Sequence, residues 1–386
     1  MRKQRGSSDS SVAAGTHKRT TSPATPLRVT LVTPGFPPDA GGVEAHTGHL
    51  VRELTARGVD VQVLTARRGL VRTAVEVRAG VRIRSFPAWR TKEMSVSPRL
   101  LLAGLRAARG AELVHVHSYH AACGFTALGG YLTPVVFTPH YHGEGHSRPA
   151  KALHRGYRFV GRLLFHAARV VVCVSEAERA AVVRDFPAAA GRTHVVPNGV
   201  DTAAVRAAQP FSGQRRTILS VGRLEPYKRV AVLLRALPAI PADVQLVVVG
   251  EGSQREELRV LATELGLGDR VRFLGRIGTD EVYRWLRTAA VLVSLSEHEA
   301  FGMAPVEAAA AGTRVVLSDI PAHREITAGH LGATARLVDP EPAGVANAII
   351  EQLAAPDRIE VEVPDWGRIA EQTIEVYQAA REDTGP

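Results

Sequence analysis

Short runs of β-branched and other apolar residues alternate along this chain with stretches in which apolar residues recur at helical spacing. Val43, Leu50, Val51 and Leu54 show the helical spacing. From Leu27 onward the alternation is typical of α/β proteins with parallel sheets. In the first half it predicts strands at Arg28–Thr33, Val59–Leu64, Val81–Phe86, Leu113–His117, Val135–Pro139, Val170–Val174 and His194–Pro197.

The alternation is interrupted after Pro197-Asn198-Gly199 by an alanine-rich stretch that ends near Gly213. It then resumes, with strands expected at Thr217–Val221, Gln245–Val249, Val271–Leu274, Val291–Leu295 and Arg314–Leu317, and helices near Arg229–Leu237, Gln254–Leu265, Thr279–Thr288 and Ala304–Ala311. We therefore expect Rossmann-like domains at residues 27–210 and 211–363, with the carboxyl ends of both sheets facing an interdomain cleft. Residues 364–386 are expected to form a helix that packs back on the first domain.

Length and composition fit two globular domains. The 386 residues exceed the about 250–300 at which one core stops growing. No apolar run reaches the about 18–20 residues of a transmembrane helix. Residues 1–26 are basic and lack an apolar signal-peptide segment, so we interpret them as a disordered tail. Cys123 and Cys173 form no CxxC pair, which argues against disulfides and favours a cytoplasmic protein.

Charge is distributed unevenly between the two halves. Residues 1–210 hold 29 Lys and Arg against 13 Asp and Glu, whereas residues 211–386 hold 19 against 25. A basic surface attracts phosphates, anionic lipids or nucleic acids. We expect no nucleic-acid partner, because aromatic residues make up only 5% of the chain and no nucleic-acid-binding motif is present.

Two features of the first half are candidates for ligand binding. Gly41 and Gly42 follow the first strand, where backbone amides can approach a ligand closely, although a plain strand-to-helix turn is an equal alternative. Histidines cluster at the ends of two predicted strands, as His115-Val116-His117 and His140-Tyr141-His142. Since no pair of Asp ligands lies nearby, we favour sugar-hydroxyl contacts or structural roles for them over a metal site.

The second half carries a basic turn in Ser220-Val221-Gly222-Arg223-Leu224-Glu225-Pro226-Tyr227-Lys228. A glycine turn followed by Arg and Lys at the head of a helix is a phosphate clamp, because Arg binds phosphoryl oxygens in pairs and Lys adds a mobile charge. A solvated basic turn is the alternative.

Two glutamates flank the segment Glu299-Ala300-Phe301-Gly302-Met303-Ala304-Pro305-Val306-Glu307. Glu299 is expected in a loop and Glu307 on the following helix, so both carboxylates can accept hydrogen bonds from ligand hydroxyls. The amides near the helix start offer an anion site. Two unrelated surface glutamates would show the same spacing.

In combination and order, these motifs resemble the retaining glycosyltransferases of family 4, which have the GT-B fold. Between Leu27 and Tyr377 the resemblance also rests on Phe137-Thr138-Pro139-His140, Val172-Cys173-Val174-Ser175-Glu176, Val196-Pro197-Asn198-Gly199-Val200-Asp201, Val249-Gly250-Glu251-Gly252 and Phe273-Leu274-Gly275. The chain departs from the family at Ala300, where the family has glycine.

The resemblance implies a role for each matching residue. Arg223 and Lys228, after the turn at Gly222, would hold the diphosphate of a nucleoside-diphosphate sugar. Glu307 would bind its ribose. Glu299 and His140 would contact the transferred sugar, and the phosphate or acceptor would lie near Gly41 and Gly42. The loop from Phe273 to Arg276 would flank the base. Further donor contacts would come from Phe301, Gly302 and Met303.

The resemblance also implies transfer with retention, and the absence of a D-x-D motif fits catalysis without a metal or other cofactor, because Arg223 and Lys228 would stabilise the leaving phosphate. A sugar-nucleotide epimerase of the same fold and a non-catalytic sugar-nucleotide-binding protein remain alternatives. The acceptor is open. Its products would belong to the cell envelope or to other glycoconjugates.

A basic amphipathic segment from Lys151 to Arg169 suggests peripheral contact with an anionic membrane, such as the inner face of the plasma membrane. A helix packed in the first domain with a solvated basic face is an equal alternative.

Overall fold

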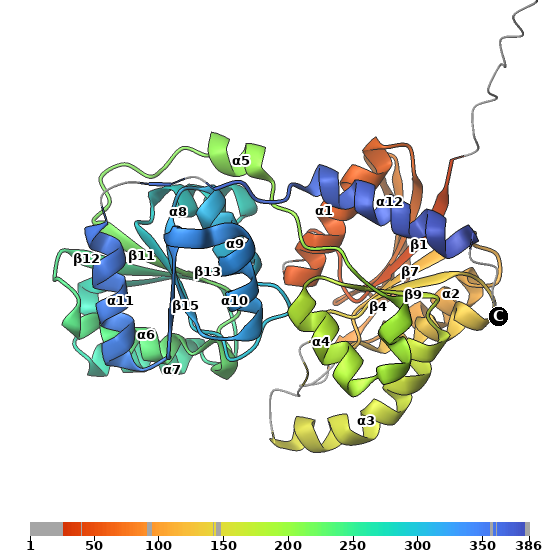
Figure 1. The fold of residues 1–386 in the computed structure, drawn as a ribbon, viewed down its shortest axis with the longest axis horizontal. Coiled ribbons are helices and arrows are strands. Elements are labelled where there is room, and N and C mark those ends of the chain that lie inside the picture. Colours follow the sequence, from red (N-terminus) through yellow and green to blue (C-terminus); the bar gives the residue numbers. More distant parts are fainter. Residues whose placement is uncertain are drawn as a thin grey trace, which may run out of the picture.

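The structure is a computed structural model that describes residues 26–39, 41–90, 95–141, 143, 148–355, 358–359 and 361–382. For residues 90, 95 and 148–156 it describes only the backbone. All of the predicted tail except Pro26 lies outside the described residues, as do Ala40 and His142. The chain forms two lobes, each built around its own sheet (Figure 1).

The first sheet has the strand order β10-β9-β8-β7-β1-β2-β4-β3. All neighbours are parallel except β3 and β4, which form an antiparallel pair. Its strands are β1 (Arg28–Thr33), β2 (Asp60–Arg67), β3 (Ala74–Arg78), β4 (Val81–Pro87), β7 (Leu113–His117), β8 (Val135–Thr138), β9 (Val170–Cys173) and β10 (Thr193–Val195), and a separate ribbon joins β5 (Trp89–Arg90) to β6 (Ser95–Val96).

Helices cover both faces of this sheet, because its central strands are buried on both sides. Local capping signals start two of them: Ser97 accepts a bond from the Leu100 N–H at the start of α2, and Ser175 accepts one from the Glu178 N–H at the start of α4. The helices of the first lobe are α1 (Gly42–Ala56), α2 (Pro98–Ala107), α3 (Arg148–Ala167) and α4 (Glu176–Asp185), with 3₁₀ segments at Ala122–Tyr131 and Pro187–Arg192. The next helix, α5 (Thr202–Ala207), already packs against the second lobe (Figure 1).

The second sheet is parallel throughout, in the order β13-β12-β11-β14-β15-β16. Its strands are β11 (Arg216–Val221), β12 (Val244–Val249), β13 (Val271–Gly275), β14 (Val291–Ser294), β15 (Arg314–Ser318) and β16 (Ala335–Val338). Around it pack α6 (Val230–Ala236), α7 (Arg255–Glu264), α8 (Thr279–Thr288), α9 (Met303–Ala310), α10 (Pro321–Ile326) and α11 (Pro342–Ala354). Short 3₁₀ or π turns lie at Pro226–Lys228, Leu237–Ala239, Gly268–Arg270, Thr327–Leu331 and Gly332–Thr334.

The last helix, α12 (Trp366–Glu382), returns to the first lobe and lies against α1 (Figure 1). Trp366 and Tyr377 are buried there in the core of the first lobe. A Cβ on Gly199 would lie 2.7 Å from the Trp366 backbone, so the two segments that cross between the lobes pass each other too closely for a larger residue.

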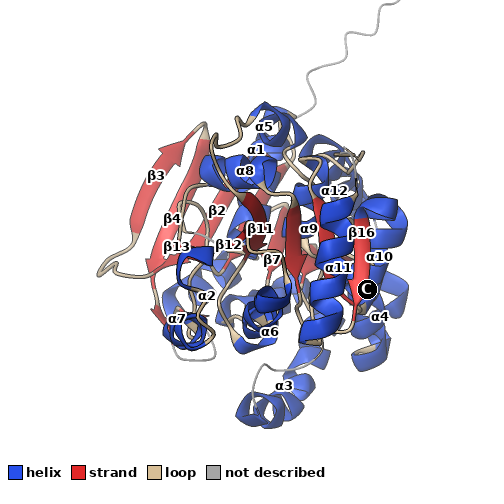
Figure 2. Ribbon diagram, turned by 90° about the vertical axis from the view of Figure 1, so that its left-hand side faces the viewer, coloured by secondary structure: helices blue, strands red, loops and turns tan. Residues whose placement is uncertain are grey.

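Two parallel-sheet units in an α/β chain were predicted, and this prediction is confirmed. Two of the longer strands, β3 and β16, were not predicted from the sequence pattern. β3 lies at the far edge of its sheet (Figure 2) and has no run of buried residues, and β16 is only half buried. Edge strands need no continuous apolar run, so hydrophobic periodicity cannot find them.

None of the helices in the described part of the chain combines the length and the apolar content that a membrane span requires.

Candidate functional site

An ion pair lies at the carboxyl end of the second sheet. Glu299 is in the loop between β14 and α9, and its Oε1 lies 2.5 Å from Lys228 Nζ. Ser296 Oγ donates to the same oxygen over 2.8 Å. Burial alone would raise the pKa of Glu299, but the charge and hydrogen bond of Lys228 lower it below the usual range. At neutral pH the loop therefore holds a carboxylate with its counter-ion in place.

Arg223 lies beside this pair on the turn after β11. Its Nη2 donates to the Tyr227 hydroxyl over 2.6 Å, and the Tyr227 ring faces both Arg223 and Lys228, at 5.6 and 5.3 Å. The cations thus share one aromatic support. Gly222 has φ 152°, and a Cβ there would lie 3.9 Å from Lys228 Nζ. The turn therefore brings its backbone close to the Lys228 ammonium group.

The start of α9 presents backbone amides to the same region. Gly302 precedes the helix with φ 101°, a left-handed conformation that favours glycine, and no side chain among the described residues caps the helix. Phe301 is buried and anchors the loop. Met303 packs against the cores of both lobes. The uncapped start of an α-helix of this length carries a partial positive charge suited to an anion.

Glu307 lies one turn into α9 and is half buried. Burial raises its pKa to about 7. This carboxyl is therefore poised between its neutral and charged forms near neutral pH, unlike Glu299. Two hydroxyls of a ligand would satisfy its ionised oxygens.

His323 on α10 is a site residue that the sequence reasoning missed. Its Nδ1 lies 2.9 Å from the Ser318 carbonyl oxygen, which can only accept, so Nδ1 carries the proton and Nε2 offers a lone pair. The ring is fully buried, and Nε2 has no hydrogen-bond partner among the described residues. It lies 3.7 Å from where a Gly302 Cβ would be. His323 belongs to no recognisable sequence motif, and its position beside Gly302 is seen only in the tertiary structure.

The glycine loop of the first lobe faces the basic residues of the second. Glu44 fills the space beside Gly41, where any Cβ would collide with its carboxylate. Burial raises the pKa of Glu44, and the charges of Arg223 and Arg276 oppose that shift. Both arginines are exposed and belong to the second lobe. Gly42 has open space around it, so its backbone is accessible to a ligand.

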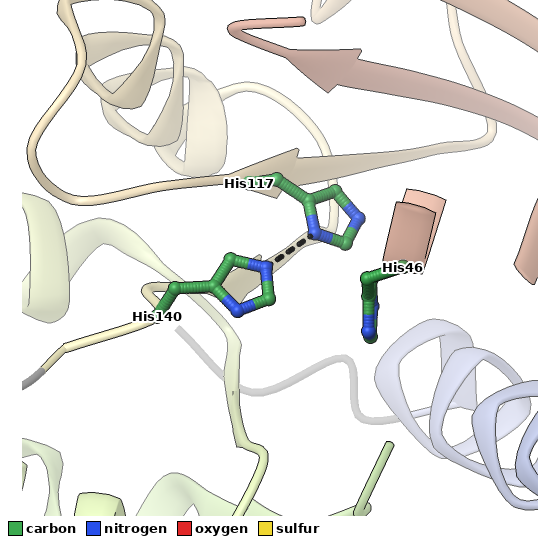
Figure 3. A group of neighbouring side chains, drawn as sticks. All are labelled: His46, His117 and His140. Atoms are coloured by element: carbon green, nitrogen blue, oxygen red, sulfur yellow. Dashed lines mark hydrogen bonds between the residues drawn. The ribbon is translucent and has the colours of Figure 1, made fainter. Parts of the chain in front are cut away.

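Histidines converge at the carboxyl ends of β7 and β8. Figure 3 shows the rings of His117 and His140 approaching each other with His46 beside them, and His117 Nδ1 lies 3.3 Å from His140 Nε2. His140 has φ 49°, a strained conformation for a residue with a Cβ. His46 Nδ1 bonds to Asn198 Oδ1 over 2.7 Å. Burial lowers the pKa of all three rings, to about 4 for His46, so they are neutral at physiological pH.

The same three residues are the one group within the described residues able to present three ligand atoms to a metal ion, with nitrogens within 4.8 Å of one another. They include no carboxylate. A metal bound there would replace the His117–His140 hydrogen bond. His115, the neighbour of this group, is fully engaged by the Tyr377 hydroxyl at 2.7 Å and by Thr138 at 2.8 Å.

The candidate residues from the sequence thus fall into three groups. Arg223, Lys228 and Glu299 are linked by one ion pair and one aromatic ring. Gly302, Met303 and Glu307 share the start of α9. Gly41 and Gly42 lie in the loop beside Glu44, whose pKa is affected by the charges of Arg223 and Arg276. His140 lies on the first lobe, and no direct contact joins it to Glu299.

Comparison with known proteins identifies the family to which a chain with this site belongs. Residues 40–204 match the family described as Glycosyltransferase Family 4, and residues 201–362 match Glycosyl transferases group 1. The chain is 30% identical to alpha-maltose-1-phosphate synthase of Mycolicibacterium smegmatis over 91% of this chain and 99% of that protein. The chain belongs to glycosyltransferase family 4.

Other members of family 4 are similar over most of their length. D-inositol 3-phosphate glycosyltransferase of Streptomyces avermitilis is 28% identical, over 89% of this chain and 84% of that protein. As the family assignment indicates, the chain is a glycosyltransferase.

Solved structures with the same fold include sucrose-phosphate synthase from Thermosynechococcus elongatus, with a TM-score of 0.70 and 24% identity over 92% of this chain and 94% of that one. HepE from Anabaena in complex with UDP and glucose has a TM-score of 0.68 and 18% identity, over 92% and 98%. The predicted GT-B fold is confirmed.

Proposed function

We propose that this glycosyltransferase moves a sugar from a nucleoside diphosphate to an acceptor hydroxyl, with retention of configuration and without a metal ion. The observation that carries the proposal is the Lys228–Glu299 ion pair between Arg223 and the uncapped start of α9. This arrangement places cations and backbone amides that suit a diphosphate next to a carboxylate that can accept a hydrogen bond from a sugar hydroxyl. Positive groups aimed at a leaving phosphate are the largest catalytic contribution in such reactions.

Each group has a part in the proposal. Arg223 and Lys228 neutralise the charge that develops on the leaving diphosphate. Glu299 accepts a hydrogen bond from the transferred sugar, and Glu307 accepts from the ribose hydroxyls. The neutral ring of His140 contacts the sugar from the first lobe. In this proposal the reaction uses no metal, because Arg223 and Lys228 supply the positive charge that stabilises the leaving diphosphate.

The first donors to test come from the structural relatives. HepE was solved with UDP, glucose and UDP-glucose, and starch synthase IV of Arabidopsis thaliana with ADP and acarbose. The test incubates the chain in EDTA with UDP-glucose, with ADP-glucose or, as a donor with a third base, with GDP-mannose, each with and without a panel of acceptor glycans, lipids and sugar phosphates. Acceptor-dependent release of nucleoside diphosphate, with the anomeric configuration retained in the product by NMR, supports the proposal. Conversion of one donor into its epimer without acceptor would instead identify an epimerase.

Arg223→Ala should lower turnover by about 10²–10³-fold with the fold intact, because it removes a group that acts on developing charge. Arg235→Ala is the matched control, since Arg235 is an exposed arginine on α6 in the same lobe. Near-normal turnover of Arg223→Ala would refute the phosphate clamp.

We also propose that the chain works in the cytoplasm and contacts an anionic membrane through α3. Phe159, Arg162, Leu163 and His166 recur at helical spacing and are exposed, Phe159 to 66% and Leu163 to 46%. Apolar and basic side chains on one exposed helical face bind interfaces. In both views α3 lies at the edge of the molecule (Figures 1 and 2).

Co-sedimentation with phosphatidylglycerol vesicles at low salt tests this surface. Binding that is reduced in a Phe159→Ala/Leu163→Ala variant and absent with phosphatidylcholine vesicles supports it. Failure of the native chain to sediment with the anionic vesicles would refute it.

A further inference from the structure

The first turn of α4 lies where the two lobes meet. This helix starts directly after β9, and α10 of the second lobe packs against it (Figure 1). Ser175 caps the helix, accepting from the Glu178 N–H over 2.9 Å. The turn therefore has one lobe on each side, and its hydrogen bonds to each lobe can be considered in turn.

Toward the second lobe, the turn is bonded to two segments. Ser175 Oγ donates to the carbonyl oxygen of Ala300 over 2.6 Å, and Ala300 directly follows Glu299. The Glu325 carboxylate on α10 accepts from the Glu176 N–H at 2.7 Å and from the Ala177 N–H at 2.8 Å. These are the first amides of α4, which otherwise lack helical partners, so a carboxylate there is stabilised by the helix end.

Toward the first lobe, the turn holds the backbone beside His140. The Glu178 carboxyl is buried and accepts from the Val174 N–H over 2.6 Å and from the Tyr141 N–H at short distance. Tyr141 follows His140, whose backbone is left-handed. A strained conformation persists only where its surroundings hold it, and the Glu178 bond fixes the backbone amide that directly follows His140.

We propose that Ser175, Glu178 and Glu325 are positioning residues, which set the placement of His140 relative to the Glu299 loop by joining both to the first turn of α4. The inference rests on the proposed function, in which His140 and Glu299 contact one sugar from opposite lobes. Within the part of the chain that the structure describes, no hydrogen bond or ion pair joins these two residues, so their separation depends on the elements between them. The α4 turn is bonded to the neighbours of both.

Arg223 and Lys228, which would hold the diphosphate, both lie in the second lobe, so a change in the placement of the lobes can be told apart from a loss of diphosphate binding. Glu325→Gln leaves Arg223 and Lys228 untouched but replaces one acceptor oxygen by an amide donor that faces an N–H. We expect UDP affinity, measured by calorimetry, to change less than about twofold, and kcat to fall about tenfold, equivalent to about 1.4 kcal/mol. The radius of gyration by small-angle X-ray scattering should rise as the lobes separate.

Glu264→Gln is the matched control, because Glu264 is an exposed glutamate at the end of α7 in the same lobe. Glu325→Asp keeps the charge and should recover part of kcat. Glu178→Gln should lower kcat without changing the radius of gyration, since its bonds lie within the first lobe. Circular dichroism confirms that each variant is folded.

The outcomes are distinct. If Glu325→Gln and Glu178→Gln both match the control in kcat, the positioning role is wrong. If Glu325→Gln loses UDP affinity as strongly as kcat, the residue acts on nucleotide binding and the inference is overturned. If the native chain neither binds UDP, ADP or GDP nor releases them from any donor, the proposed function itself fails.

Discussion

Replacing Lys228 by methionine removes the counter-ion of Glu299 while keeping most of the side-chain volume. Both side chains of the pair are 19% exposed, so the remaining carboxylate would be left largely buried with its Ser296 hydrogen bond. Breaking a buried pair from one side typically costs about 3–5 kcal/mol. Since water reaches part of this pair, we expect about 2–4 kcal/mol.

The loss of stability should depend on pH in a defined direction. In the native chain the pKa of Glu299 lies below 4.5, so its stabilising contribution is present above that pH and is lost as the pH falls through the lowered pKa. In Lys228→Met the lysine charge no longer opposes the effect of burial on Glu299, so the pKa of Glu299 in the folded variant rises. Stability is then lost as the pH increases through the raised value. The difference between variant and native chain should therefore grow between about pH 5 and about pH 8.

Denaturant unfolding at these two pH values measures the effect. Each kcal/mol should lower the melting temperature by about 2–4 °C for a domain of this size. Lys228→Met/Glu299→Gln is the control, because removing both charges leaves no buried anion, and it should be less destabilised at about pH 8 than Lys228→Met. Turnover of Lys228→Met should fall by about 10²–10³-fold. Equal destabilisation at both pH values would refute the reasoning.

Three further outcomes follow from the site. For Glu307, whose pKa is about 7, the affinity for UDP should rise as pH increases through that value, because the ionised carboxylate accepts from two hydroxyls; calorimetry on Glu307→Gln should show a flat profile. Tyr377→Phe should lower the free energy of unfolding by about 1–3 kcal/mol by denaturant titration, since it leaves a buried nitrogen of His115 unpaired. His323→Leu should lower the free energy of unfolding by about 1–3 kcal/mol in the same titration, because it removes the buried N–H that Nδ1 donates to the Ser318 carbonyl oxygen. A variant as stable as the native chain would contradict this expectation.

The residues that carry the phosphate chemistry were recognisable because each stands in a local motif. Gly222, Arg223 and Lys228 follow a strand within one turn, and Glu299 and Glu307 flank the start of one helix. Such features depend on backbone conformation over a few residues, and local sequence determines that conformation directly. The chemical meaning of the motifs, however, came from their resemblance to a family.

The strands of the two sheets could also be predicted from the sequence, because strands buried on both faces appear as continuous apolar runs. β1 and β7 have the predicted bounds, whereas the exposed edge strand β3 has no apolar run and was missed.

What the sequence alone determined is therefore the alternation of buried strands and helices, the division into two sheets and the local motifs at strand ends. The tertiary structure decided which of these ends meet: Glu325 at the start of α4, Tyr377 on His115, and His323 beside Gly302. These contacts join residues far apart in the chain, and they depend on how whole helices pack, which no local pattern specifies. The side chains of His115, His323 and Tyr377 are polar and buried and that of Glu325 is half buried, so a sequence shows them only as isolated polar residues within or beside the hydrophobic pattern.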